Sequence, residues 1–401
     1  MRISTAQMYA STTANISAKQ ADLARIQNQL SSGKRIASLA DDPAAAAGAA
    51  VLQSDLSSNG QFDQNRQVAQ QRLSFAENTL GAAGDSLQSM RSLLVSAGNG
   101  GLSDTDRNTI ANQLRQGLDS LVGLANTSDG QGGYLFGGFR ETSAPFVATA
   151  SAVTYAGDDG GRTINVSNTR AIATGFNGAD VFSRIATGNG VFTTAAAAAN
   201  TGSGTIDSGQ VSNAAALTGD SYQIRFHAAA GVTTYDVWDT TTNAAVSSAN
   251  AYAAPASIAL PGISVGVAGS PANGDNFDIA PSGNQDIFTT LKNAITVLST
   301  PTNGNTTAVT NGLRVALTNI DQALSHISDQ RGVAGARLNE LDQVASLSSA
   351  RNVDLSATLS SLQDVDYVKT ISEFSVAQTG VQAALASYAK IAQTKLFDYL
   401  K

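Results

Sequence analysis

The feature that most constrains this chain is a heptad repeat of leucine between residues 43 and 97. Leucines recur every seven residues and alternate with small or flexible apolar residues, giving Leu73, Leu80, Leu87 and Leu94 with Ala69, Ala76, Ala83, Met90 and Ala97. This spacing places apolar side chains along one narrow stripe of a helix, as in coiled coils. Asp42 as N-cap and Pro43 as first helical residue predict where the helix begins. One helix over 43–97 would be about 80 Å long, which favours a rod over a compact enzyme core.

The same spacing recurs toward both ends of the chain. Near the N-terminus the stripe consists of Tyr9, Ile16, Leu23 and Leu30, and Gly33 predicts the helix end. Near the C-terminus it consists of Leu313, Ile320, Ile327, Ala334 and Leu341, followed after a break by Tyr367, Phe374, Val381 and Tyr388. Such narrow stripes are unstable alone. We therefore expect the N- and C-terminal helices to pack against each other.

The middle of the chain has a different character. Residues 129–285 are rich in Gly, Thr, Ser, Asn and Ala, with short alternating strands such as 163–166 and 222–226 separated by turn signals. Between residues 186 and 285 there are six carboxylates and one cation, Arg225. The pattern predicts an exposed, acidic, β-rich module.

Together these segments predict an α+β fold, in which a long coiled-coil-like bundle of N- and C-terminal helices carries an inserted, outward β-rich module. We expect residues 1–40 and 360–401 to form the terminal helices. Residues 41–185 and 286–359 would form a helical rod domain with a small β part, and residues 186–285 the inserted outer domain.

Composition excludes several classes of function. Only 14% of the residues are charged and the net charge is −7, which argues against a nucleic-acid binder. Cysteine is absent, which removes disulfides and thiolate chemistry. No run approaches the ~20 apolar residues of a membrane span, and the first twenty residues lack the apolar stretch of a secretory signal. Export would therefore need another route.

Catalytic chemistry is poorly supported. The two histidines, His227 and His326, fit structural or surface roles better than a zinc site. Gly262-Ile-Ser264-Val-Gly266 matches the G-x-S-x-G pattern of hydrolases, but that motif needs a helix directly after it, and Pro271 follows too soon. We expect a glycine-punctuated strand there, and no catalytic residue, cofactor or metal site. The hydrolase alternative predicts an activity that depends on Ser264.

Particular residues resemble the flagellin superfamily. The N-terminal signature comprises Ser32, Gly33, Arg35, Ile36, Asp41, Asp42 and Pro43. Within that superfamily, the opening 1–5, the Tyr134-Leu-Phe-Gly-Gly138 stretch running into Pro145-Phe146, and the segment 362–367 are similar to proteins of the hook-filament junction. So is the closing stretch with Leu396, Phe397, Tyr399 and Leu400. The likeness is specific to about residue 185 and again from residue 286.

The resemblance implies a structural component of the bacterial flagellum, an adaptor at the hook-filament junction on which the filament assembles. It implies an inner coiled-coil tube of terminal helices, with Tyr9, Ile16, Leu23 and Leu30 and Tyr367, Phe374, Val381 and Tyr388 as assembly seams. It implies type III export and an extracellular location. The implied partners are further copies in a ring-like tier, the neighbouring hook-associated protein, flagellin, and a cytoplasmic export chaperone on the C-terminal helix. Two alternatives stay open, namely filament flagellin itself and a surface-recognition role for the acidic middle.

Overall fold

The computed structural model of the 401-residue chain describes residues 5–36, 38–130, 132–149, 151–302 and 306–393. The chain divides into two compact units. The first, residues 1–64 with 343–401, is called the terminal unit, and the second, residues 65–342, the central unit. Within the described ranges, no helix combines the length and apolarity needed to span a bilayer.

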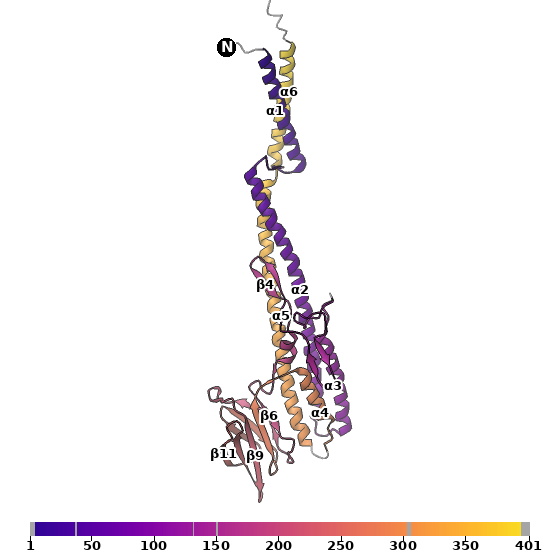
Figure 1. Cartoon of the computed structure of the whole chain (residues 1–401), viewed down its shortest axis with the longest axis vertical. Coiled ribbons are helices and arrows are strands. Elements are labelled where there is room, and N and C mark those ends of the chain that lie inside the picture. Colours follow the sequence, from indigo (N-terminus) through magenta and orange to yellow (C-terminus); the bar gives the residue numbers. More distant parts are fainter. Residues whose placement is uncertain (1–4, 37, 131, 150, 303–305, 394–401) are drawn as a thin grey trace, which may run out of the picture. The chain divides into compact units, whose positions relative to one another are not determined.

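The described ranges contain six α-helices: α1 (Thr5–Ser32), α2 (Pro43–Ala97), α3 (Asp104–Ala125), α4 (Ile287–Ser299), α5 (Thr306–Gln363) and α6 (Tyr367–Gln393). The terminal unit contains α1, α6, the start of α2 and the end of α5. Helices α1 and α6 lie side by side (Figure 1). The predicted packing of the N- and C-terminal helices against each other is therefore confirmed.

Two helix boundaries follow the predicted signals at Asp42 and Gly33, and a capping box sets a third. Asp42 caps α2, because its side-chain oxygen accepts a hydrogen bond from the Ala45 N–H at 3.0 Å. Ser103 and Asp106 form a reciprocal capping box at the start of α3. Gly33 ends α1 with a φ of +68°, a left-handed conformation that glycine adopts without steric cost. Local sequence chemistry thus sets the ends of these helices.

The core of the central unit is built from the heptad stripes. All nine residues of the α2 stripe between Ala69 and Ala97 are buried, and so are the five residues of the α5 stripe from Leu313 to Leu341. Arg331 follows Ile327 by four residues, on the same side of α5, and its guanidinium pairs with the Glu77 carboxylate at 2.7 Å. Its guanidinium lies beside Gly81.

The inserted module is a two-sheet sandwich within the central unit. One antiparallel sheet has the order β11 (Ala244–Ala251), β10 (Val232–Asp239), β9 (Tyr222–Ala229), β14 (Asn276–Pro281) and β6 (Phe192–Ala196). The other has the order β12 (Ala256–Leu260), β13 (Ile263–Ala268) and β7 (Thr205–Ile206), and β8 (Gln210–Val211) also pairs with β13. Alternate residues, such as Ile224 and Phe226, fill the core between the sheets. The predicted α+β class with an inserted β module is confirmed.

The remaining strands are short. They are β1 (Phe146–Ala148) with β2 (Val153–Tyr155), β3 (Thr163–Ser167) with β4 (Arg170–Ala173), and β5 (Ile185–Ala186) with β15 (Asn284–Gln285). Two short helical segments lie between strands, namely η1 (Ala179–Ser183) before β5 and η2 (Ala214–Ala216) after β8. Because β5 pairs with β15, the chain enters and leaves the sandwich at adjacent points. The sandwich is therefore an insertion between α3 and α4.

Candidate assembly surface

The signature residues of the N-terminal segment form a clasp on the C-terminal segment of the same chain. The Val365 N–H donates to the Gly33 carbonyl at 3.0 Å, and the Arg35 N–H donates to the Gln363 carbonyl at 2.7 Å. A β-bridge joins Lys34 and Asp364 between them. This short antiparallel contact ties the end of α1 to the connection between α5 and α6.

The side chain of Arg35 reinforces the clasp. Its guanidinium donates to the Leu362 carbonyl at 2.7 Å and lies 3.5 Å from the Asp42 carboxylate. The buried Gln29 amide donates to the Arg35 carbonyl at 2.8 Å. Arg35 thus joins the C-terminus of α5 to the residue that caps α2, and a cation beside helix C-terminal carbonyls is favourable.

The other signature residues complete the same turn. Ile36 is buried, and the Asp41 carboxylate accepts the Ser38 N–H at 2.8 Å. The Ser32 hydroxyl accepts the Lys34 N–H at 3.3 Å, and Pro43 is the first residue of α2. The closing signature residues lie outside the described ranges: Leu396, Phe397, Tyr399 and Leu400.

The two predicted terminal seams face each other within one chain. Tyr9 and Tyr388 meet edge to face, with ring centroids 6.1 Å apart. Since the helices are antiparallel, steps of seven residues in opposite directions bring three more pairs to the same level: Ile16 with Val381, Leu23 with Phe374, and Leu30 with Tyr367. All but Tyr367 are half-buried, and the Tyr367 hydroxyl lies over Gly33. Each chain thus uses these residues partly for its own helix pair.

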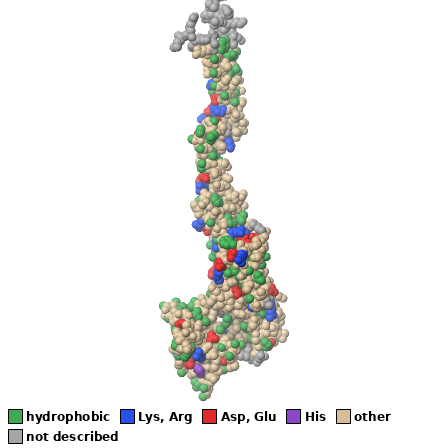
Figure 2. Space-filling model, in the orientation of Figure 1, with side chains coloured by type: hydrophobic (Ala, Val, Ile, Leu, Met, Phe, Trp, Pro, Cys, Tyr) green, Lys and Arg blue, Asp and Glu red, His purple; other side chains and the backbone are tan. Residues whose placement is uncertain are grey.

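Helix α6 also carries apolar side chains that the described part of the chain leaves largely exposed. Five large apolar side chains of α6 are exposed, and we call them together the α6 outer surface: Tyr367 (54%), Val368 (83%), Ile371 (52%), Val376 (70%) and Leu385 (45%). Of the twenty exposed large apolar side chains in the described ranges, ten lie in the terminal unit, which holds less than a third of the residues. Figure 2 shows hydrophobic side chains at the surface of the terminal helices on the visible face. Exposed apolar residues gathered in this way mark an interaction surface.

A polar groove of about 670 Å³ lies beside the clasp. Charged residues of both signs line it, among them Arg25, Asp41, Asp364, Lys369 and Glu373. In the described part of the chain, no three acidic or histidine side chains are arranged to hold a metal ion. The groove therefore offers hydrogen-bonding and ion-pairing positions beside the apolar surface of α6.

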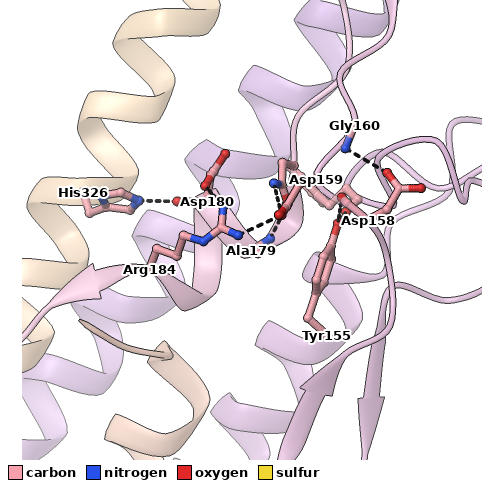
Figure 3. A network of polar contacts seen from close by, with 10 residues as sticks. Tyr155, Asp158, Asp159, Gly160, Ala179, Asp180, Arg184 and His326 are labelled. Atoms are coloured by element: carbon pink, nitrogen blue, oxygen red, sulfur yellow. Dashed lines mark hydrogen bonds and ion pairs between the residues drawn. The ribbon is translucent and has the colours of Figure 1, made fainter. Parts of the chain in front are cut away.

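The residues of the hydrolase alternative do not form a catalytic arrangement. Ser264 lies within β13, where its hydroxyl bonds to that of Ser257 at 2.9 Å, and the strand continues past Gly266 to Ala268. The predicted glycine-punctuated strand is confirmed. His326 on α5 bonds through Nε2 to the Asp180 carbonyl at 2.6 Å (Figure 3). His227 bonds to Asp236 at 3.0 Å on the sandwich surface.

The acidic turn at Asp158 and Asp159 organises the backbone. The Asp158 carboxylate accepts N–H bonds from Phe139 and Gly160 at 2.8 and 2.9 Å (Figure 3). These two donors hold the pKa of the Asp158 carboxyl below its ordinary range. Bonds from the side chains of Asn177 and Arg184 lower the pKa of Asp159 likewise. Both carboxylates therefore work as turn-forming acceptors.

Comparisons with known proteins agree with this arrangement. The helical N-terminal region of bacterial flagellin matches residues 3–141, and the helical C-terminal region of bacterial flagellin matches residues 317–400. Flagellar hook-associated protein 3 of Salmonella typhimurium is 37% identical over 185 residues. That match covers 46% of this chain and 58% of the relative, so the chain spans somewhat more than half the length of the curated relatives that it matches.

Solved structures match over a larger share. FlgL of Xanthomonas campestris is 35% identical with a TM-score of 0.71, over 77% of this chain and 99% of that one. The flagellar junction protein FlgL of Legionella pneumophila is 30% identical with a TM-score of 0.73, over 79% of this chain and all of that one. These likenesses favour the junction proteins over filament flagellin. The chain therefore belongs to the flagellin superfamily and, within it, to the family of flagellar hook-associated protein 3.

Proposed function

We propose that this chain is the adaptor at the hook-filament junction of a bacterial flagellum, on which the flagellin filament assembles, and that it acts by self-assembly of its terminal helices. The single observation that carries the proposal is the α6 outer surface. The chain's own helix α1 packs against α6 but leaves these five side chains about half or more exposed. A second copy of the chain would cover this surface.

The size of the surface fits cooperative assembly better than a stable dimer. Burying a large apolar side chain contributes about 1.5–3 kcal/mol, so five half-exposed side chains would contribute about 5 kcal/mol together. Association itself costs an estimated 4–15 kcal/mol. One α6 outer surface alone therefore gives weak pairing, whereas several neighbours around each helix would give a stable tier. This supports a ring-like tier in which the terminal helices form an inner tube.

Other partners follow from the proposed place in the flagellum. A tier at the junction would contact a neighbouring hook-associated protein on one side and flagellin on the other. Its place outside the cell would require secretion through the flagellar type III export route. Before export, a cytoplasmic chaperone on the C-terminal helix would keep the α6 outer surface from premature assembly. The absence of catalytic geometry at Ser264 and the structural character of the relatives support a role without enzymatic activity.

A deletion strain of the source bacterium tests the proposal. We expect hooks without filaments and flagellin released into the medium, and recovery of filaments when the full chain is supplied. A chain with Val368→Asp and Val376→Asp should be made and folded but should not restore filaments, because two buried charges at the interface would be unpaired. Val232→Asp, on an exposed strand of the sandwich, is the matched control. Normal filaments in the deletion strain would refute the proposal.

A further inference from the structure

Phe139 is an exposed aromatic side chain that is held rigidly. It is 65% exposed, and it follows the Tyr134–Gly138 stretch in the central unit. Its N–H donates to the Asp158 carboxylate at 2.8 Å, and the Tyr155 hydroxyl donates to the Asp158 carbonyl at 2.9 Å. Figure 3 shows the hydrogen bonds that the Gly160 N–H and the Tyr155 hydroxyl donate to Asp158 in this turn.

Two glycines leave space for the contacts that hold Phe139 in this position. Gly138 has a φ of +69°, and a side chain there would meet the Asp158 carboxylate at 2.3 Å. A side chain at Gly160 would meet the Phe139 ring at 2.1 Å, so the ring lies directly on the Gly160 backbone. Because these contacts already fix the loop, burying the Phe139 ring in an interface would cost little conformational entropy. Rigid exposed aromatic residues of this kind are typical anchors of protein interfaces.

A trough without charged residues lies elsewhere in the central unit. Its volume is about 330 Å³, and it lies between the end of β6 and the helices α4 and α5. Small and apolar side chains line most of it, including Ala196, Val297, Ala308 and Val315. This volume is at the lower end of the range of about 300–1,000 Å³ for ligand pockets. Its size and its uncharged lining suit one aromatic side chain.

We propose that Phe139 of one copy inserts into the trough of the next copy. Phe139 does not line the trough of its own chain, so the two features would meet only between copies. A contact between two different patches is heterologous, and repetition of such a contact produces a ring or a helix. This inference rests on the proposed self-assembly and adds a specific contact to it, outside the terminal helices.

Single-cysteine variants test the contact directly, because the chain contains no cysteine. Arg140→Cys places a thiol next to an intact Phe139, and Ala308→Cys places one at the exposed rim of the trough. The two full-length variants are mixed at concentrations where copies associate and treated with a short bis-maleimide. We expect a 140–308 cross-link between copies. Adding Phe139→Ala to the Arg140→Cys chain should reduce that cross-link about tenfold or more.

A separate reporter distinguishes this inference from the proposed function. Val376→Cys cross-links copies through the α6 outer surface and does not depend on Phe139. Cross-linking through residue 376 without a 140–308 product would overturn the Phe139 contact and leave the proposed function intact. Absence of both products would overturn both proposals. Val147→Ala, also exposed and apolar, is the matched control for Phe139→Ala. Both variants should keep the thermal unfolding profile of the parent, and an equal loss of the 140–308 product with Val147→Ala would overturn the specific role of Phe139.

Discussion

Replacing two valines of the α6 outer surface should change folding and assembly in opposite directions. Val368 and Val376 are 83% and 70% exposed on α6. Alanine has a higher helix propensity than valine, by up to about 0.7 kcal/mol per residue. In the isolated chain, Val368→Ala with Val376→Ala should therefore leave the stability of the helix pair unchanged or slightly raise it.

Assembly should weaken by a predictable amount. Each substitution removes two methyl groups' worth of apolar surface, and each buried group contributes about 0.8 kcal/mol. Scaled by the exposed fractions, the two changes together cost about 2.5 kcal/mol at each interface, or about sixtyfold in the association constant. Circular dichroism of dilute chain during thermal unfolding measures the first effect. Sedimentation velocity over a concentration series measures the second.

Val232→Ala provides the control, because Val232 has similar exposure but lies at the start of β10 in the sandwich. It should not shift the association constant. Assembly of the α6 double variant as strong as that of the parent would refute the proposed interface, since the exposed valines would then not be buried by neighbouring copies. A clearly lower unfolding temperature of the dilute double variant would also refute it, since the valines would then stabilise the helix pair itself.

Three further predictions concern the central unit. Leu80→Ala should lower its unfolding free energy by about 2–5 kcal/mol in a denaturant titration, because Leu80 is fully buried; a loss no larger than that of Val95→Ala, at an exposed position of the same helix, would contradict the heptad core. Ser103→Ala should cost about 1 kcal/mol in the same titration by removing the N-cap of α3, and Ser103→Gly much less. Because the folded-state pKa of Asp158 is depressed, the stability that its carboxylate contributes is present above the unfolded pKa of 3.8 and is lost as the pH falls below 3.8. The near-ultraviolet circular dichroism should therefore be constant from pH 7 to 5 and should change as the pH falls below 3.8. The same change should be smaller in Asp158→Asn.

The helices could be predicted from sequence because their determinants are local. Asp42, Gly33 and the Ser103 capping box act within one turn, and the buried stripe follows from a spacing of seven residues. The sandwich could be predicted only as a β-rich segment. Its strand order depends on pairings between distant residues, such as β6 with β14, which local patterns do not encode.

The assembly surface was harder to foresee for a related reason. Heptad spacing marks Phe374, Val381 and Tyr388 as a seam, but it does not say whether the partner is α1 of the same chain or a helix of another copy. The contact between Tyr9 and Tyr388 shows that the partner on one side of α6 is α1 of the same chain. Val368 and Val376 lie outside the heptad series and carry no sequence signal. Their importance appears only when the structure shows both side chains largely exposed among the described residues.

The residues that identify the family and the residues proposed to do its work are different sets, for a physical reason. Gly33, Arg35 and Asp42 are each fixed by geometry: a positive φ, a reach to the Leu362 carbonyl, and a helix cap. Few other residue types satisfy these requirements, so they form a recognisable motif. An apolar surface on α6 requires only side chains of suitable size, which many combinations of valine, isoleucine and leucine provide. The motif therefore indicates that the two ends of the chain are bound to each other. The exposed apolar side chains of α6 indicate the surface through which these ends would bind other copies.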